Sequence, residues 1–247
     1  MSPSGGPVIV QGDFTLLLEM DHPDAALARD ALAPLAELVK SPDHYHTYRL
    51  SPLSVWNAAA GGLSADAMIL ALSRFSRYPV PSHVEERVRD LASRFGCVRL
   101  WRDPDGDLRL DVDDPVVADM LARRNDLGPF LQERRSLTSF SVPRLFRGRL
   151  KQALVRAVWP AEDLAGYAPG EPFAMALKDA TGDGRPFALR RYQTLAAESF
   201  LAGGELRGGS GVVVLPCGAG KTVVAMAVMS RLATSTLVLV TGVTAAR

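Results

Sequence analysis

Residues 210–222 are SGVVVLPCGAGKT, and this stretch decides the fold class of the C-terminal part of the chain. Four apolar residues in a row are typical of a strand buried on both faces. The segment VVAMAVMSRLAT (223–234) predicts an apolar helix, and STLVLVT (235–241) predicts a second buried strand. A strand, loop, helix and strand in this order predict an α/β unit with a parallel sheet and a right-handed crossover.

The turn Gly218-Ala219-Gly220-Lys221-Thr222 lies between the predicted strand and helix, the position of a phosphate-binding loop. Glycines allow successive backbone N–H groups to point at phosphate oxygens, and the helix N-terminus adds partial positive charge. The Lys221 ammonium can reach the β- and γ-phosphates, and the Thr222 hydroxyl can ligate the magnesium that bridges them. The alternative is an ordinary glycine-rich turn with an incidental lysine.

Upstream, residues 1–96 predict a small α+β domain without a recognisable catalytic motif. VIV (8–10) and FTLLLEM (14–20) flank a short turn and predict two strands, and YHTYRL (45–50) predicts a third. Apolar residues at three- and four-residue spacing predict one helix from Asp21 to about Val39. Serine N-caps and apolar spacing predict three further helices, which begin at Ser51, Ser64 and Ser82.

Residues 97–168 predict a second small α+β domain. Apolar residues alternate on both sides of Asp103-Pro-Asp-Gly106, which predicts a hairpin, and a helix is expected from about Asp114 to Arg124. Gly, Pro, Asp and Ala are frequent in the following stretch, so we expect a linker at 169–186 before the phosphate-loop domain at 187–247.

Charge is unevenly distributed along a chain whose net charge is only +1. Residues 102–119 contain seven aspartates and two arginines, whereas SVPRLFRGRLKQALVRAVWP (141–160) contains five basic residues and no acidic one. Basic side chains supply most sequence-independent affinity for DNA, although a solvated helix face is the simpler alternative. The candidate DNA contacts are Arg144, Arg147, Arg149, Lys151 and Arg156.

Composition excludes several protein classes. With 247 residues, 47% hydrophobic and 22% charged, the chain is not a disordered, collagen-like or disulfide-stapled protein. No segment approaches about 18 apolar residues, and the first thirty residues lack a basic stretch followed by an apolar run. We therefore expect a cytoplasmic protein without membrane contact, in which Cys97 and Cys217 are reduced thiols.

LRRYQ (189–193) followed by SGVVVLPCGAGKT resembles the XPB-type DNA helicases, the family of the xeroderma pigmentosum group B protein. Leu215 stands where the strict phosphate-loop template has glycine, a departure that superfamily 2 helicases tolerate. RGRLKQALVRAVWPAEDLAGY (147–167) resembles the region just before their helicase core. The N-terminal domain of bacterial members is similar to VIVQGDFTLLLEMDHP (8–23), HTYRLSPLSVWNAAAGGLS (46–64) and SRYPVP (76–81).

The resemblance implies ATP-driven, 3′-to-5′ unwinding or translocation of DNA, with two RecA-like domains gripping ATP between them. Adenine recognition is implied for Gln193, with Arg190 nearby, although Arg191 stands where the family usually has proline. An ordinary glutamine at a helix start remains the alternative for Gln193. Phosphate contact is implied for Gly218, Ala219, Gly220, Lys221 and Thr222, with Lys221 and Thr222 as catalytic residues and Thr222 as the Mg²⁺ ligand.

The family's magnesium-holding acidic box, its water-activating glutamate and its arginine finger are expected beyond Arg247. Because phosphoryl transfer needs all these parts, we expect this sequence to be the N-terminal part of a longer helicase and not to hydrolyse ATP alone. The resemblance also implies that the N-terminal domains bind duplex or damaged DNA, with residues 97–168 as a domain that senses distorted DNA. The implied protein partners are a nuclease or other repair proteins.

Two other functions stay open. One is a non-catalytic DNA-binding or interaction module with a vestigial nucleotide loop. The other is a different superfamily 2 enzyme, such as a restriction translocase, which would share LRRYQ and GAGKT but not the N-terminal segment.

Overall fold

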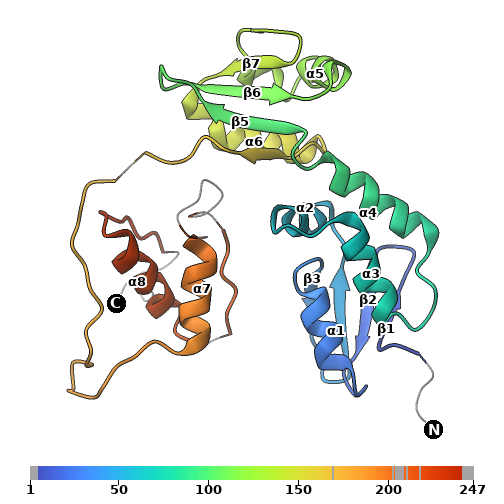
Figure 1. The fold of residues 1–247 in the computed structure, drawn as a ribbon, viewed down its shortest axis with the longest axis vertical. Helices are drawn as coiled ribbons and strands as arrows, with labels where there is room; N and C mark the ends of the chain where they lie inside the picture. Colours follow the sequence, from blue (N-terminus) through green and yellow to red (C-terminus); the bar gives the residue numbers. More distant parts are fainter. Residues whose placement is uncertain are drawn as a thin grey trace. The chain divides into compact units, whose positions relative to one another are not determined.

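The computed structural model divides the chain into two compact units, residues 1–162 and residues 163–247 (Figure 1). Cys217 lies outside the described residues, as do residues 202, 204–208 and 210. The structure describes residues 5–168, 170–201, 203, 209, 211–216 and 218–240.

The first unit begins with a four-stranded antiparallel sheet in the order β1-β2-β4-β3. Leu16 and Leu18 are fully buried on one face of β2, whereas Leu17 between them lies on the opposite face and is partly exposed. This alternation gives the sheet one face against the core. The predicted strands at 8–10, 14–20 and 45–50 are confirmed, and the sheet consists of β1 (Val8–Val10), β2 (Thr15–Glu19), β3 (Glu37–Lys40) and β4 (Tyr45–Arg49).

Four helices complete the first core. α1 packs on β2 and α3, α3 packs on β1 and α4, and α2 packs on α4. The Oγ of Ser51 accepts the backbone N–H of Ser54 at 3.1 Å, and the Oγ of Ser64 accepts that of Ala67 at 3.1 Å, so these two predicted N-caps are confirmed. The helices are α1 (Ala25–Leu32), α2 (Pro52–Ala60), α3 (Ala65–Phe75) and α4 (Ser82–Arg94).

The predicted helix from Asp21 to Val39 is wrong beyond Leu32. The chain turns there and forms β3, in which Leu38 pairs with Tyr48 of β4. Leu38 and Val39 continue the apolar spacing of α1, yet they lie on an edge strand and are more than half exposed. Local spacing did not reveal the backbone partner that β4 provides, and that partner decides the conformation.

A second sheet in the order β7-β6-β5-β8 follows α4. The predicted hairpin is confirmed, because β5 and β6 pair antiparallel and Gly106 in their turn has a φ of 94°, a conformation that favours glycine. The Asp103 carboxylate, 5% exposed, pairs with Arg109 and Arg135 and ties this turn to the chain before β7. The strands are β5 (Val98–Arg102), β6 (Leu108–Val112), β7 (Ser139–Val142) and β8 (Ala161–Asp163).

Two helices and two short 3₁₀ turns accompany the second sheet. α5 packs on β6, which confirms the predicted helix near residues 114–124. α6 buries Leu150, Ala153 and Leu154, so its basic residues lie outside that buried stripe. These elements are α5 (Pro115–Ala122), η1 (Gly128–Phe130), η2 (Arg144–Phe146) and α6 (Arg147–Arg156).

The second unit is built from two helices, α7 (Arg191–Leu201) and α8 (Lys221–Leu232), around the buried residues Ala197, Val224 and Ala227. The predicted strands around 212–215 and 235–240 are wrong for the described residues, which form no strand there. Val212 and Leu239 are 90% and 84% exposed, respectively. A β-strand needs at least one hydrogen-bonded neighbour, and the described residues of these two segments do not pair with one another.

In the described part of the chain, no single helix is long and apolar enough to cross a membrane. Only α2 and α3 taken together reach the required length and composition, and they are bent by 115° at the break between them.

Candidate functional site

The predicted phosphate loop lies at the N-terminus of α8. Gly218 and Gly220 both have a φ of 78°, which glycine adopts without a steric penalty, and Gly220 directly precedes the first helical residue, Lys221. The Lys221 Nζ donates a hydrogen bond of 3.1 Å to the carbonyl oxygen of Pro216. The lysine ammonium is therefore held over the loop, at the end of the helix where the backbone N–H groups are free of helical partners.

Two neighbouring side chains of α7 hold the loop at a single carbonyl. The Tyr192 hydroxyl donates to the oxygen of Ala219 at 2.7 Å, and the Gln193 Nε2 donates to the same oxygen at 3.1 Å. The Gln193 Oε1 accepts the backbone N–H of Arg190 at 3.0 Å. Gln193 is only 6% exposed, so both ends of its amide are satisfied inside the unit.

The structure brings Gln193 beside the phosphate loop, where its side-chain amide contacts the Ala219 carbonyl. The contact also explains why residue 220 is glycine, because a Cβ at that position would lie 2.6 Å from the Gln193 Nε2. Tyr192 was not predicted from the sequence, where its only signal is its position directly before Gln193. Arg190 and Thr222 are both exposed, Arg190 before α7 and Thr222 in the first turn of α8.

The five candidate DNA contacts lie on η2 and α6. Arg144, Arg149 and Arg156 are exposed, and Arg149 and Arg156 are seven residues apart, which places them on one face of the helix. Arg147 and Lys151 are half-buried and interact with other residues of the chain. The basic segment predicted from sequence is therefore partly a solvent-facing surface and partly packed into its domain.

Comparisons with known proteins find helicase-like similarity in both the N-terminal and the C-terminal part of the chain. A family model described as "Helicase conserved C-terminal domain" matches residues 8–136, and one described as "Type III restriction enzyme, res subunit" matches residues 186–244. The proteins named "DNA 3'-5' helicase XPB" from Kineococcus radiotolerans and Mycobacterium tuberculosis are each 46% identical over 98% of this chain.

The chain belongs to the helicase family that the model over residues 8–136 describes, and it is similar to XPB-type helicases over 98% of its length. It spans 42% of the length of the two bacterial relatives. A more distant relative from Enterocytozoon bieneusi, named "General transcription and DNA repair factor IIH helicase/translocase subunit XPB", is 26% identical over 95% of this chain and 38% of its own length. Because these similarities include the N-terminal domain, they favour an XPB-type protein over a restriction translocase that shares only the phosphate loop.

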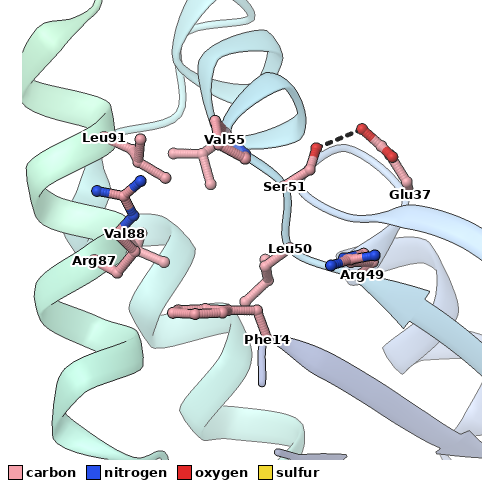
Figure 2. Close-up of a pocket in the computed structure, with 10 residues that line it drawn as sticks. Phe14, Glu37, Arg49, Leu50, Ser51, Val55, Arg87, Val88 and Leu91 are labelled. Carbon is pink, nitrogen blue, oxygen red and sulfur yellow. Dashed lines mark hydrogen bonds between the residues drawn. The ribbon is translucent and has the colours of Figure 1, made fainter. Parts of the chain in front are cut away.

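A separate pocket of about 370 Å³ lies in the first unit. Figure 2 shows side chains from β4, α2 and α4 around it, with the Ser51 hydroxyl donating to the Glu37 carboxylate at its rim. Arg49 and Arg87 add positive charge to the walls, and apart from Glu37 and Ser51 the other lining residues are apolar. None of the residues predicted to bind nucleotide or DNA lines this pocket.

Among the residues that the structure describes, no group of three or more His, Cys, Asp or Glu side chains could hold a metal ion.

Proposed function

We propose that this chain forms the ATP-binding loop and the DNA-contacting domains of an ATP-dependent DNA helicase or translocase that moves 3′ to 5′. The observation that carries the proposal is the loop at the N-terminus of α8, with two left-handed glycines and the Lys221 ammonium above it. The similarity to bacterial proteins named "DNA 3'-5' helicase XPB" over 98% of this chain supports the direction and the substrate.

In the proposed nucleotide site, residues 218–222 surround the phosphates of ATP. Gly218 and Gly220 have left-handed conformations, of the kind that allow successive backbone N–H groups to converge on an anion. The Lys221 Nζ now donates to the Pro216 carbonyl, and a phosphate oxygen is a stronger acceptor for the same group. Bound Mg²⁺ would neutralise phosphate charge, with the Thr222 hydroxyl as its protein ligand.

Gln193 and Arg190 complete the proposed site on the adenine side. The Gln193 amide already bridges the Arg190 backbone and the Ala219 carbonyl, so it is positioned between the adenine side and the phosphate side. In this proposal Gln193 recognises the base and transmits its presence to the loop through Ala219. Tyr192 supports the same carbonyl and keeps the loop in place.

The proposed DNA surface consists of the basic residues of η2 and α6. Arg144, Arg149 and Arg156 are exposed on a segment without acidic residues, which suits sequence-independent contact with phosphates. Arg147 and Lys151 contribute to the same positive segment although they also interact within the domain.

We further propose the domain limits 1–96, 97–168, 169–186 and 187–247, the last as the start of a RecA-like domain. The match of residues 186–244 to a restriction-enzyme helicase model supports this start. Repair proteins such as a nuclease are the proposed protein partners, and the cytoplasm is the proposed location, since XPB-type activity requires access to DNA.

Nucleotide binding by the 247-residue chain tests the proposal. Titration of a fluorescent ATP analogue with Mg²⁺ is expected to show binding that Lys221→Ala weakens at least about tenfold, because a charge-assisted contact is lost. Lys178→Ala removes another exposed lysine of the same unit and is expected to bind like the wild type. Equal affinity of wild type and Lys221→Ala would favour the alternative, a DNA-binding module with a vestigial loop.

A further inference from the structure

The pocket that Arg49 and Arg87 line, which we call the arginine pocket, lies where the turn before β2, the end of β4, the start of α2 and the middle of α4 meet (Figure 2). Its volume of about 370 Å³ falls within the range of small-molecule sites. Val55, Val88 and Leu91 in its wall belong to the buried core. The pocket therefore rests on packed core side chains of a folded domain.

Phe14 forms one wall of the arginine pocket in a backbone conformation that is rare for a bulky residue. Its φ is 68°, in the left-handed region that favours glycine. The Phe14 N–H donates to the Gln11 carbonyl at 3.1 Å, and the Phe14 carbonyl accepts the Leu50 N–H at 2.9 Å, so backbone hydrogen bonds hold this conformation. Glycine would suit the turn better, which means that the ring itself contributes contacts. The contacts open to it are the first core and the pocket.

Positive charge exceeds negative charge around the arginine pocket, which two arginines and one glutamate line. The Glu37 carboxylate accepts the Ser51 hydroxyl, and it forms no ion pair with Arg49 although the two residues lie opposite each other in the sheet. Arg49 forms no ion pair with any residue in the described parts of the chain, whereas Arg87 pairs with Asp90 at 2.8 Å. The Arg49 guanidinium is therefore available to a bound anion, and Arg87 keeps N–H donors that Asp90 does not use.

Another pocket of about 370 Å³ in the first unit provides an internal comparison. Its charged lining residues are three aspartates and one arginine, namely Asp90, Asp113, Asp114 and Arg94. Negative charge exceeds positive charge there, which disfavours a bound anion. At equal volume, the charge of the lining residues therefore favours an anion in the arginine pocket.

We propose that the arginine pocket binds a small organic carboxylate with an apolar body. The carboxylate pairs with Arg49 in the additional field of Arg87, and the apolar body lies against Phe14, Val55 and Val88. A guanidinium binds a carboxylate through charge-assisted hydrogen bonds, and the apolar area removed from water adds affinity. The volume suits a free small molecule, because a stable protein partner needs a much larger surface. This site goes beyond the proposed function, since no residue proposed to bind nucleotide or DNA lines it.

Calorimetric titration of the 247-residue chain with 2-naphthoate and with its uncharged amide tests the site. The two ligands share one apolar body and differ in charge. The wild type is expected to bind 2-naphthoate at least about tenfold more tightly than the amide, because only the carboxylate forms a charge-assisted contact. Arg49→Gln is expected to reduce that preference below about threefold. Arg89→Gln removes an exposed arginine of α4 outside the pocket and is expected to match the wild type.

Phe14→Gly tests the apolar wall. Glycine adopts a φ of 68° without a steric penalty, so the turn is kept while the ring is lost. Both ligands are expected to bind about tenfold more weakly to this variant, since both use the ring. Circular dichroism checks that the variant is folded, and the two arginine variants decide the proposal independently of it.

Several results would overturn the carboxylate site. One is equal affinity of the wild type for the two ligands, or no binding of 2-naphthoate. Another is 2-naphthoate affinity in Arg49→Gln that equals the affinity in Arg89→Gln. A tripeptide ending in phenylalanine that binds more tightly than 2-naphthoate would overturn the free small molecule as the occupant, because it would assign the pocket to a polypeptide.

Discussion

The Arg94 guanidinium donates a hydrogen bond of 3.2 Å to the backbone carbonyl of Val158, which lies 64 residues further along the chain. The same guanidinium forms a two-pronged ion pair with Asp90 and lies 5.0 Å from the centre of the Trp159 ring. Arg94 is the last residue of α4, and Val158 follows the end of α6. One side chain thus joins the helix of the first α+β part to the chain that leaves the proposed DNA-binding helix.

Replacing Arg94 with lysine is expected to destabilise the first unit by about 1–2 kcal/mol. A lysine keeps the charge, but a single ammonium cannot bind the Asp90 carboxylate in two prongs, reach the Val158 carbonyl and stack on Trp159 at once. Urea unfolding followed by tryptophan fluorescence measures the loss, because Trp56, Trp101 and Trp159 all lie in this unit. Arg123→Lys, at an exposed position, serves as the control, and an equal effect of the two changes would contradict the assignment.

Val158 itself has a φ of 62°, which is rare for a β-branched residue. It occupies the position after α6 where helices commonly end on glycine, and the N–H of Trp159 donates to the carbonyl of Leu154. Its side chain packs against the core of the first sheet, so packing compensates for backbone strain.

Two substitutions at residue 158 separate the stabilisation by side-chain packing from the cost of backbone strain. Val158→Ala is expected to lose packing and keep the strain, whereas Val158→Gly loses the same packing but removes the strain. The glycine variant is therefore expected to be more stable than the alanine variant by about 1 kcal/mol in urea unfolding. Alanine equal to or more stable than glycine would show that the left-handed conformation carries no cost here.

Much of the first unit could be predicted from the sequence because its signals are local. Ser51 and Ser64 cap helices as their residue types require, and the alternation around Gly106 gives the hairpin its register. The strand at 37–40 could not be predicted, since Leu38 fits a helical spacing and becomes a strand only because Tyr48 lies opposite it. Pairing with a distant segment leaves no mark on local periodicity.

The candidate site was also only partly predictable from the sequence. The order of the loop and helix around Gly220 follows from the motif, whereas the hydrogen bond between Gln193 and the loop is seen only in the structure. Tyr192 was missed because its hydroxyl reaches the loop only when α7 lies beside α8. The apolar run at 212–215 predicted a strand that the described residues do not form, because a strand forms only where hydrogen-bonding partners are available.

The two loop glycines provide a matched pair for mutagenesis. Both have a φ of 78°, so alanine costs about 1–2 kcal/mol of strain at either position. A Cβ on Gly218 meets nothing within 4 Å, whereas one on Gly220 would lie 2.6 Å from the Gln193 Nε2. Titration with an ATP analogue is expected to show a loss for Gly220→Ala that exceeds the loss for Gly218→Ala by about tenfold or more. Equal losses would mean that the contact with Gln193 does not shape the loop.

The Cys97 thiol is expected to react slowly with alkylating reagents near neutral pH. Burial raises the pKa of this thiol, and the Asp113 carboxylate raises the pKa further, while Arg99 acts in the opposite direction. The Cys97 Sγ also donates to the Ser93 carbonyl at 3.1 Å, which favours the protonated form. Because only the thiolate reacts, a raised pKa lowers the rate at a given pH and moves the rise in rate to higher pH than for a free cysteine.

Asp113→Asn tests directly whether the Asp113 carboxylate raises the pKa of the Cys97 thiol. The substitution removes the negative charge and releases the Arg99 guanidinium that pairs with Asp113, so both changes lower the pKa of the Cys97 thiol. In a Cys217→Ser background, where Cys97 is the one remaining cysteine, iodoacetamide labelling at pH 8 is expected to be several times faster in Asp113→Asn than in its parent. Asp105→Asn changes an exposed carboxylate of the same domain and is expected to leave the rate unchanged. If Asp113→Asn labels no faster than its parent, burial alone controls this thiol and the carboxylate has no part in its reactivity.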